Sequence, residues 1–77
     1  MIQDILAFAH EKVSEGRQVV LVTVTDTSGS SPASVGQVMA VLADGTSVGT
    51  VGGGTTEHLI IQRAVEALKN GERVFKF

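Results

Sequence analysis

Three consecutive glycines, Gly52 to Gly54, separate a strand-like run from a helix-like run, and they constrain the fold more than any other feature of the sequence. Glycine accepts backbone conformations with positive φ, so a run of glycines indicates a sharp reversal of the chain. Residues 47–51 before it are typical of a strand. Apolar residues after it recur at helical spacing: Ile61, Ala64, Val65 and Leu68. The sequence therefore predicts a strand-to-helix junction at residues 49–57, and this junction is the best candidate functional site.

The remaining elements follow from periodicity and turn signals. An N-terminal helix is predicted by one apolar stripe, ended by Gly16: Ile2, Ile5, Leu6, Ala9 and Val13. Residues 18–25 are rich in β-branched side chains and predict a central strand covered on both faces. Residues 37–42 and 47–51 predict a hairpin around Asp44-Gly45, because both central turn positions tolerate positive φ. Asn70-Gly71 is expected to end the second helix, and residues 73–77 alternate like a last strand.

This order, α-β-β-β-α-β, predicts an α/β fold, with α+β as the alternative. The third strand, the second helix and the last strand can form a right-handed crossover, which places these two strands parallel. The hairpin adds antiparallel pairing, so we expect a mixed four-stranded sheet covered by one layer of two helices. Because the last strand ends in apolar residues, we expect it to contact a partner.

The composition of the chain argues against several classes of function. The chain has 77 residues, which is one domain, and it has no cysteine and only two histidines, His10 and His58. Disulfides and thiolate metal sites are therefore excluded. The six basic residues are scattered and the net charge is −2, which does not favour nucleic-acid binding. The longest apolar run, residues 19–22, is too short to span a membrane. No basic segment suggests a signal peptide, and we expect a cytoplasmic location.

The glycine junction can bind an anion. Amides in the first turn of a helix lack intrahelical acceptors, and the helix dipole favours negative charge there. Glycines also let a phosphate approach the backbone closely, although they could equally serve only to reverse the chain. A Walker motif is excluded because no lysine follows the glycines, and Glu57 stands where a dinucleotide fingerprint needs its third glycine.

Glu57 itself has two interpretations. If Gly54 is the N-cap, Glu57 is the third helical residue and its carboxylate can accept a hydrogen bond from the N-cap amide. Alternatively, it accepts hydrogen bonds from a ligand with amino or amide donors, such as a pterin. The polar loop of residues 28–36 offers several hydroxyls, either to a ligand or as a plain connection. No histidine is linked to this loop by its spacing, so the sequence does not favour hydrolase chemistry.

Together these segments resemble a known family. The matching pieces are Gly29-Ser30-Ser31-Pro32, Gly36, Met39, Asp44-Gly45, and Gly49-Thr50-Val51-Gly52-Gly53-Gly54 with Glu57. Their order and spacing resemble the N-terminal domain of the xanthine dehydrogenase accessory factor family, of the XdhC/CoxI type. The resemblance covers about residues 22–68.

The resemblance implies a non-enzymatic chaperone that binds molybdopterin, the organic part of the molybdenum cofactor, and assists a xanthine dehydrogenase-like molybdoenzyme. Residues 1–77 then form the single N-terminal domain, without the C-terminal Rossmann-like domain of the family. The implied cofactor-binding residues are Gly29, Ser30, Pro32, Gly36, Gly52, Gly53, Gly54, Thr55 and Glu57, with no catalytic or metal-ligating residue.

Two departures from the family pattern support an alternative function. Ala33 stands where the family usually has arginine, and Thr55 where it commonly has cysteine. The alternative is a divergent structural or interaction module without the ligand. Such a module would form a homo-oligomer or partner a separate Rossmann-domain chain.

Overall fold

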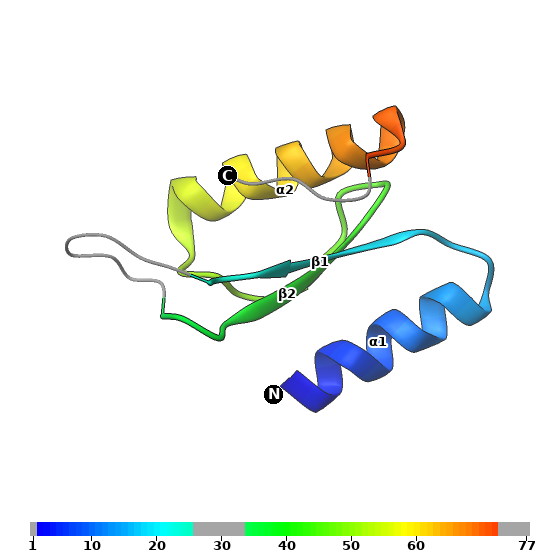
Figure 1. Cartoon of the computed structure of the whole chain (residues 1–77), viewed down its shortest axis with the longest axis horizontal. Coiled ribbons are helices and arrows are strands. Elements are labelled where there is room, and N and C mark those ends of the chain that lie inside the picture. Colours follow the sequence, from blue (N-terminus) through cyan, green and yellow to red (C-terminus); the bar gives the residue numbers. More distant parts are fainter. Residues whose placement is uncertain (1, 26–33, 73–77) are drawn as a thin grey trace.

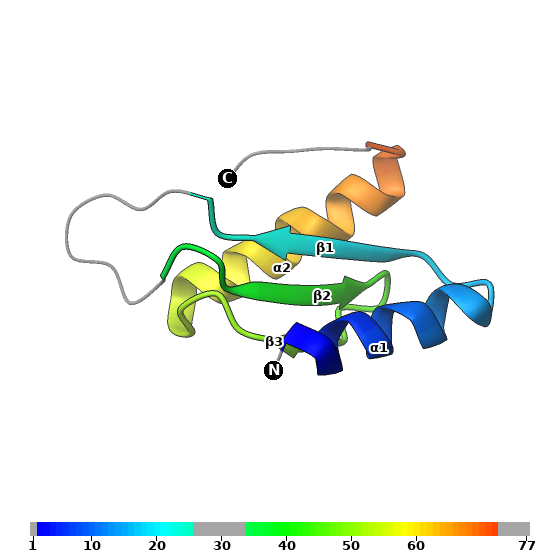
Figure 2. The same cartoon turned by 60° about the horizontal axis from the view of Figure 1, so that its bottom comes forward.

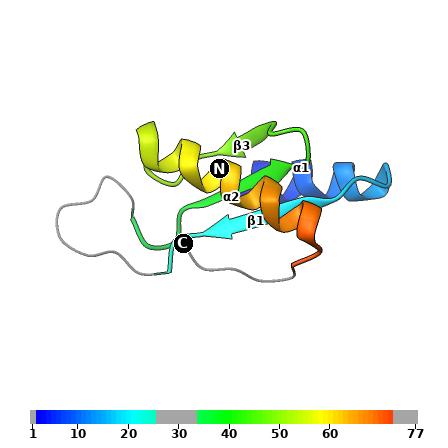
Figure 3. The same ribbon diagram turned by 90° about the horizontal axis from the view of Figure 1, so that it is seen from above.

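The computed structural model describes residues 2–25 and 34–72. Within them, two helices, α1 (Ile2–Ser14) and α2 (Gly54–Asn70), accompany three strands, β1 (Val19–Thr23), β2 (Val38–Leu42) and β3 (Ser47–Gly49). The strands form one antiparallel sheet in the order β1-β2-β3. Figures 1 and 3 show α1 and α2 on opposite faces of this sheet.

The observed class is α+β, the alternative of the two predicted classes. All pairing among the described strands is antiparallel, so the described sheet is not mixed. The predicted parallel fourth strand, residues 73–77, lies outside the described residues. The expected single layer of helices is wrong, because the two helices cover different faces (Figure 1). The reason lies in β2, whose apolar side chains point to both faces and require cover on both.

The strand covered on both faces is β2 rather than β1. On the α2 side, Met39 and Val41 are buried in one core cluster with Val51, Ile60 and Ala64. On the α1 side, Ala40 and Leu42 are also buried. By contrast β1 lies at an edge of the described sheet, and the side chain of Leu21 is 49% exposed. The β-branched side chains of residues 18–25 thus predicted a strand correctly but did not predict how far it is buried.

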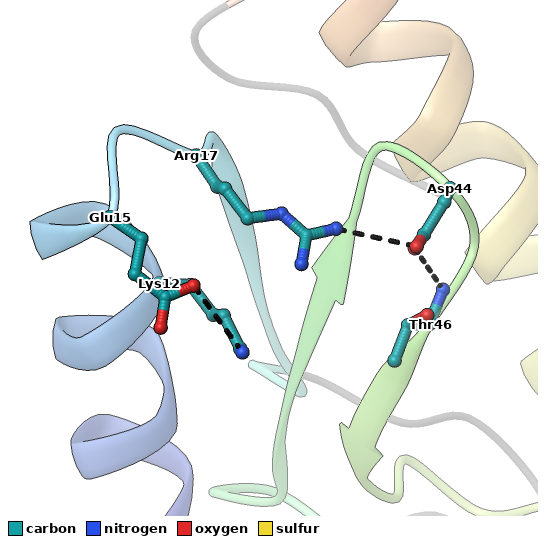
Figure 4. A network of polar contacts seen from close by, with 5 residues as sticks. All are labelled: Lys12, Glu15, Arg17, Asp44 and Thr46. Atoms are coloured by element: carbon teal, nitrogen blue, oxygen red, sulfur yellow. Dashed lines mark hydrogen bonds and ion pairs between the residues drawn. The ribbon is translucent and has the colours of Figure 1, made fainter.

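The predicted hairpin between β2 and β3 is confirmed, with a different turn. The amide of Gly45 donates to the carbonyl of Leu42 at 2.9 Å, and only Gly45 of the Asp-Gly pair has a positive φ, 90°. Figure 4 shows that Asp44 accepts a hydrogen bond from the Thr46 amide at 2.9 Å and pairs with Arg17 at 3.3 Å. These contacts, led by the Thr46 amide, lower the pKa of the Asp44 carboxyl. Asp44 therefore joins the hairpin to the segment that connects α1 and β1.

Both helices end at the predicted glycines. Gly16 follows α1 with φ 84°, and Gly71 caps α2 with φ 69°. Of the predicted buried face of α2, Ala64 is buried, whereas Ile61, Val65 and Leu68 are half-buried. The other buried residues of α2 are Ile60 and Ala67, which the pattern did not predict. Neither described helix is long and apolar enough to cross a membrane.

Candidate functional site

The strand-to-helix junction has an unusual backbone. Gly49, Gly52, Gly53 and Gly54 all have positive φ, at 94°, 115°, 74° and 70°. These conformations are strained for any residue with a Cβ, so the glycine run is required by the path of the chain. Gly49 has a second constraint: a Cβ added there would lie 2.5 Å from the carbonyl oxygen of Val38 and 2.7 Å from Cδ1 of Ile5. The junction is therefore built from glycine at both its start and its end.

The Glu57 carboxylate holds this backbone in place. Its Oε2 atom accepts hydrogen bonds from the Thr50 hydroxyl at 2.7 Å, the Gly53 amide at 2.8 Å and the Val51 amide at 3.2 Å. The expected contact between Glu57 and the N-cap amide is thus present, although the N-cap is Gly53 and not Gly54. Because it also binds the amide and hydroxyl before the glycines, Glu57 fixes the whole turn and not only the first turn of α2.

The hydrogen bond from Thr50, followed by those from Val51 and Gly53, lowers the pKa of the Glu57 carboxyl against the opposing effect of burial. The carboxylate is therefore charged at neutral pH. Its charge also suits the positive end of the α2 dipole.

Three amides of the first turn remain open. A helix leaves its first four amides without intrahelical acceptors, here those of Gly53, Gly54, Thr55 and Thr56. Glu57 accepts from the Gly53 amide, and Gly53, the N-cap residue, makes no side-chain capping hydrogen bond of its own. The structure gives the other three amides no acceptor among the residues it describes. Gly54, Thr55 and Thr56 are also exposed, so a ligand can reach them.

The space above these amides suits an anionic group. A Cβ added at Gly53 or Gly54 would meet no atom within 4 Å, so these glycines leave open space beside the amides, here called the cradle. The backbone is the only source of positive potential nearby in sequence, because residues 18–62 contain no lysine or arginine. Within the described residues, no three metal-ligating side chains cluster. The arrangement can therefore hold a phosphate by backbone donors.

The structure brings together five of the predicted binding residues at this junction: Gly52, Gly53, Gly54, Thr55 and Glu57. Gly36 lies just before β2, where its amide donates to the carbonyl of Val24 at 2.8 Å. Gly29, Ser30 and Pro32, like Ala33, lie outside the described residues.

Sequence reasoning placed Thr50 within the candidate junction but gave it no role there. Its hydroxyl makes the shortest contact with Glu57 and leads the lowering of the Glu57 pKa. The available signal was a hydroxyl residue directly between a strand-like run and the glycines, seven positions before an acidic residue.

A pocket that the sequence did not reveal borders the junction. It has a volume of about 500 Å³ and lies between the start of α1, the start of β2 and the end of β3. Its lining residues are Asp4, Ile5, Gly36, Gln37, Val38, Val48, Gly49 and Thr50. Thr50 and Gly36 thus connect the pocket with the predicted site.

Comparison with protein families matches residues 13–77 to the XdhC and CoxI family. No curated protein and no solved structure matches the chain. The match covers most of the 77 residues, including both strands of the hairpin, the glycine junction and α2. The chain belongs to the XdhC and CoxI family.

Proposed function

We propose that the chain binds molybdopterin and acts as a non-enzymatic accessory domain in the maturation of a xanthine dehydrogenase-like molybdoenzyme. Family membership supports the role in molybdenum enzyme maturation. One structural observation supports the binding: three exposed amides, those of Gly54, Thr55 and Thr56, end a glycine turn that Glu57 holds in place.

The residues fit the phosphate of molybdopterin. The open amides supply donors to its oxygens, and the cradle at Gly53 and Gly54 admits the group without a steric clash. Because Glu57 already holds the turn in place, the chain loses less conformational entropy when the ligand binds. Oε2 of Glu57 is used by Thr50, Val51 and Gly53, so Glu57 supports the site and does not bind the phosphate. When bound, the cofactor supplies the pterin-dithiolene group that carries molybdenum; the domain holds and presents it.

Calorimetric titration of the chain with molybdopterin tests this proposal. Gly53→Ala places a methyl group in the cradle and strains a residue with φ 74°. Gly71→Ala is the control for a methyl group added in free space at a positive φ away from the site, because Gly71 has φ 69° and lies at the far end of α2; its ψ of 22°, against 179° at Gly53, makes it the less strained position. We expect Gly53→Ala to weaken binding about 10-fold, equivalent to about 1.4 kcal/mol. Gly71→Ala should leave the affinity unchanged. Equal losses in both variants, or no binding to the parent chain, would overturn the proposal.

A second candidate function is an interaction module without the ligand. The lack of lysine or arginine in residues 18–62 favours it, as do large apolar side chains left exposed on α1 and β1: Leu6, Val13 and Leu21. Light scattering distinguishes the two functions. A stable homo-oligomer that shows no heat of binding with molybdopterin would favour the module, whereas a monomer that binds would exclude it.

A further inference from the structure

We infer that residues 50–53 form a preformed binding site for a carboxylate, which Glu57 occupies as the chain's own ligand. The donors are the Thr50 hydroxyl and the amides of Val51 and Gly53, here together called the 50–53 site. This site is separate from the open amides of Gly54 to Thr56, and it exists whether or not the chain binds molybdopterin. When the Glu57 side chain is removed, the 50–53 site takes up a small carboxylate from solution.

The donors of the 50–53 site converge on a single oxygen atom. Oε2 of Glu57 lies 2.7 Å from the Thr50 hydroxyl, and the amide nitrogens of Gly53 and Val51 lie at 2.8 and 3.2 Å. Two of the three donors, those of Thr50 and Val51, come before the triple glycine and follow β3, so the site is more than the free end of α2. Hydroxyl and amide donors gathered around one point bind an anionic oxygen strongly.

The core holds both sides of the 50–53 site independently of Glu57. Val51 is 2% exposed and lies in the core cluster that also contains Ile60 of α2. The strand side and the helix side of the site are therefore fixed to the same cluster. Figure 2 shows the turn between β3 and α2 at the end of the sheet where β2 begins. Because a packed core resists local rearrangement, the donors stay in place when the Glu57 side chain is lost.

The contacts of Glu57 indicate which ligand the 50–53 site takes. The second carboxylate oxygen, Oε1, accepts no hydrogen bond from the residues that the structure describes. The site therefore covers one oxygen of its ligand and leaves the other free, which suits a carboxylate better than a phosphate with its three acceptor oxygens. Thr50 is exposed and Glu57 is half-buried, so a small anion can reach the site from solvent.

Acetate rescue of Glu57→Ala tests the inference. The substitution removes a CH₂COO⁻ group, which matches acetate in size and charge. Amide-detected NMR of the variant with sodium acetate, compared with sodium chloride at the same ionic strength, should show saturable shifts of the Val51 and Gly53 amides toward their positions in the parent chain. Thermal unfolding in the same solutions should recover about half of the lost unfolding temperature once acetate exceeds its dissociation constant by 10-fold.

Three control chains show whether acetate enters the 50–53 site or acts elsewhere. The parent chain and Glu57→Gln should show no acetate shifts at Val51 and Gly53, because their own side chains fill the site. Glu66→Ala lacks an exposed acid of the same helix, and its unfolding temperature should gain no more from acetate than that of the parent.

A second substitution in the Glu57→Ala chain tests the contribution of one donor. Thr50→Val removes the hydroxyl from the 50–53 site and should weaken acetate binding about 5-fold. Thr23→Val, at an exposed position of β1, should leave the acetate affinity unchanged.

Acetate shifts of Val51 and Gly53 that occur in Glu57→Ala and not in the parent chain would support the inference. Equal rescue by chloride, shifts confined to the amides of Gly54 to Thr56, or a variant that stays unfolded at every acetate concentration would overturn it, because the core must hold the donors in place. The carboxylate site and the proposed phosphate site can fail separately, since acetate is followed at Val51 and Gly53 and phosphate at Gly54 to Thr56.

Discussion

The two ends of helix α2 both carry a glycine with positive φ, but in different conformations and for opposite purposes: ψ is 179° at Gly53 and 22° at Gly71. At the C-terminal end, Gly71 has φ 69°, and the amides of Gly71 and Glu72 donate to the carbonyls of Leu68 and Ala67 at 3.3 and 2.9 Å. Arg63 then binds the Glu72 carboxylate through both guanidinium nitrogens, at 3.0 and 2.7 Å. Backbone and side chains together close this end.

At the N-terminal end, Gly53 has φ 74°, yet only one of the first four amides has an acceptor among the described residues. Glu57 accepts from the Gly53 amide and also holds the incoming chain, at Thr50 and Val51. The comparison shows that a glycine with positive φ at a helix end does not by itself make a binding site. What matters is whether neighbouring side chains consume the backbone groups that the glycines expose.

We expect the largest effect on stability from a substitution at Gly49, where the glycine turn that leads into the N-terminal end of α2 begins. Gly49→Ala should lower the free energy of unfolding by about 3 kcal/mol, from the clash of its Cβ with the Val38 carbonyl and from strain at φ 94°. Gly16→Ala, with φ 84° and free space, isolates the strain and should cost about 1 kcal/mol. Urea unfolding measures both. Equal costs would show that the close approach at Gly49 has no energetic effect.

Loss of the Glu57 side chain should have the next largest effect. Glu57→Ala leaves three donors without their charged acceptor and should cost about 2 kcal/mol, since water replaces part of each bond at this half-buried position. Glu66→Ala on the same helix removes only an exposed ion pair with Arg63, 3.7 Å long, and should cost less than about 0.5 kcal/mol. Thermal unfolding compares them; similar costs would mean that Glu57 does not hold the junction.

The contribution of Glu57 should also depend on pH. Its pKa is lowered in the folded chain, so its stabilising effect is complete above the ordinary glutamate pKa of about 4.3 and is lost as the pH falls through the lower folded value. The stability difference between the parent chain and Glu57→Gln should therefore be constant near neutral pH and shrink in acid. A difference that grows as the pH falls would contradict the sign of this shift.

The two cap glycines should contribute differently to stability. Gly53→Ala and Gly71→Ala each place a methyl group in free space, but Gly53 has ψ 179°, in a region that only glycine adopts readily, whereas Gly71 has ψ 22°, in the left-handed helical region. We therefore expect Gly53→Ala to cost about 2 kcal/mol and Gly71→Ala about 1 kcal/mol. Guanidinium unfolding of the two variants measures both costs, and equal costs would contradict this difference in backbone strain.

The smallest expected effect concerns the closed end. Arg63→Lys keeps a charge but loses the two-pronged contact with Glu72, and it should lower the unfolding temperature only slightly without changing ligand affinity. Thermal unfolding and the molybdopterin titration provide the two readouts. A change in affinity would show that the two ends of α2 are coupled.

Much of the local structure followed from the sequence. Periodicity located α1 and α2, and Gly16, Asp44-Gly45 and the glycine run marked the turns between elements, because turn chemistry is a local property. The placement of α1 on the opposite face to α2, and of β2 at the centre of the described sheet, depends on long-range packing and was not predictable from local pattern.

The candidate site also combines features that the sequence predicts with contacts that depend on the fold. The role of Glu57 at the helix start was predictable from its position after the glycines. Its contacts with Thr50 and Val51 were not, because they depend on the path of the chain through four positive φ values. The pocket joins residues from Asp4 to Thr50, and only the assembled fold brings them together.

The most direct test of the difference between the two ends is an amide-detected NMR titration of the chain with inorganic phosphate. The account predicts progressive shifts of the Gly54, Thr55 and Thr56 amides, while the amides of Gly71 and Glu72, already bound to Leu68 and Ala67, stay in place. Shifts of equal size at both ends, or none at Gly54 to Thr56, would contradict it.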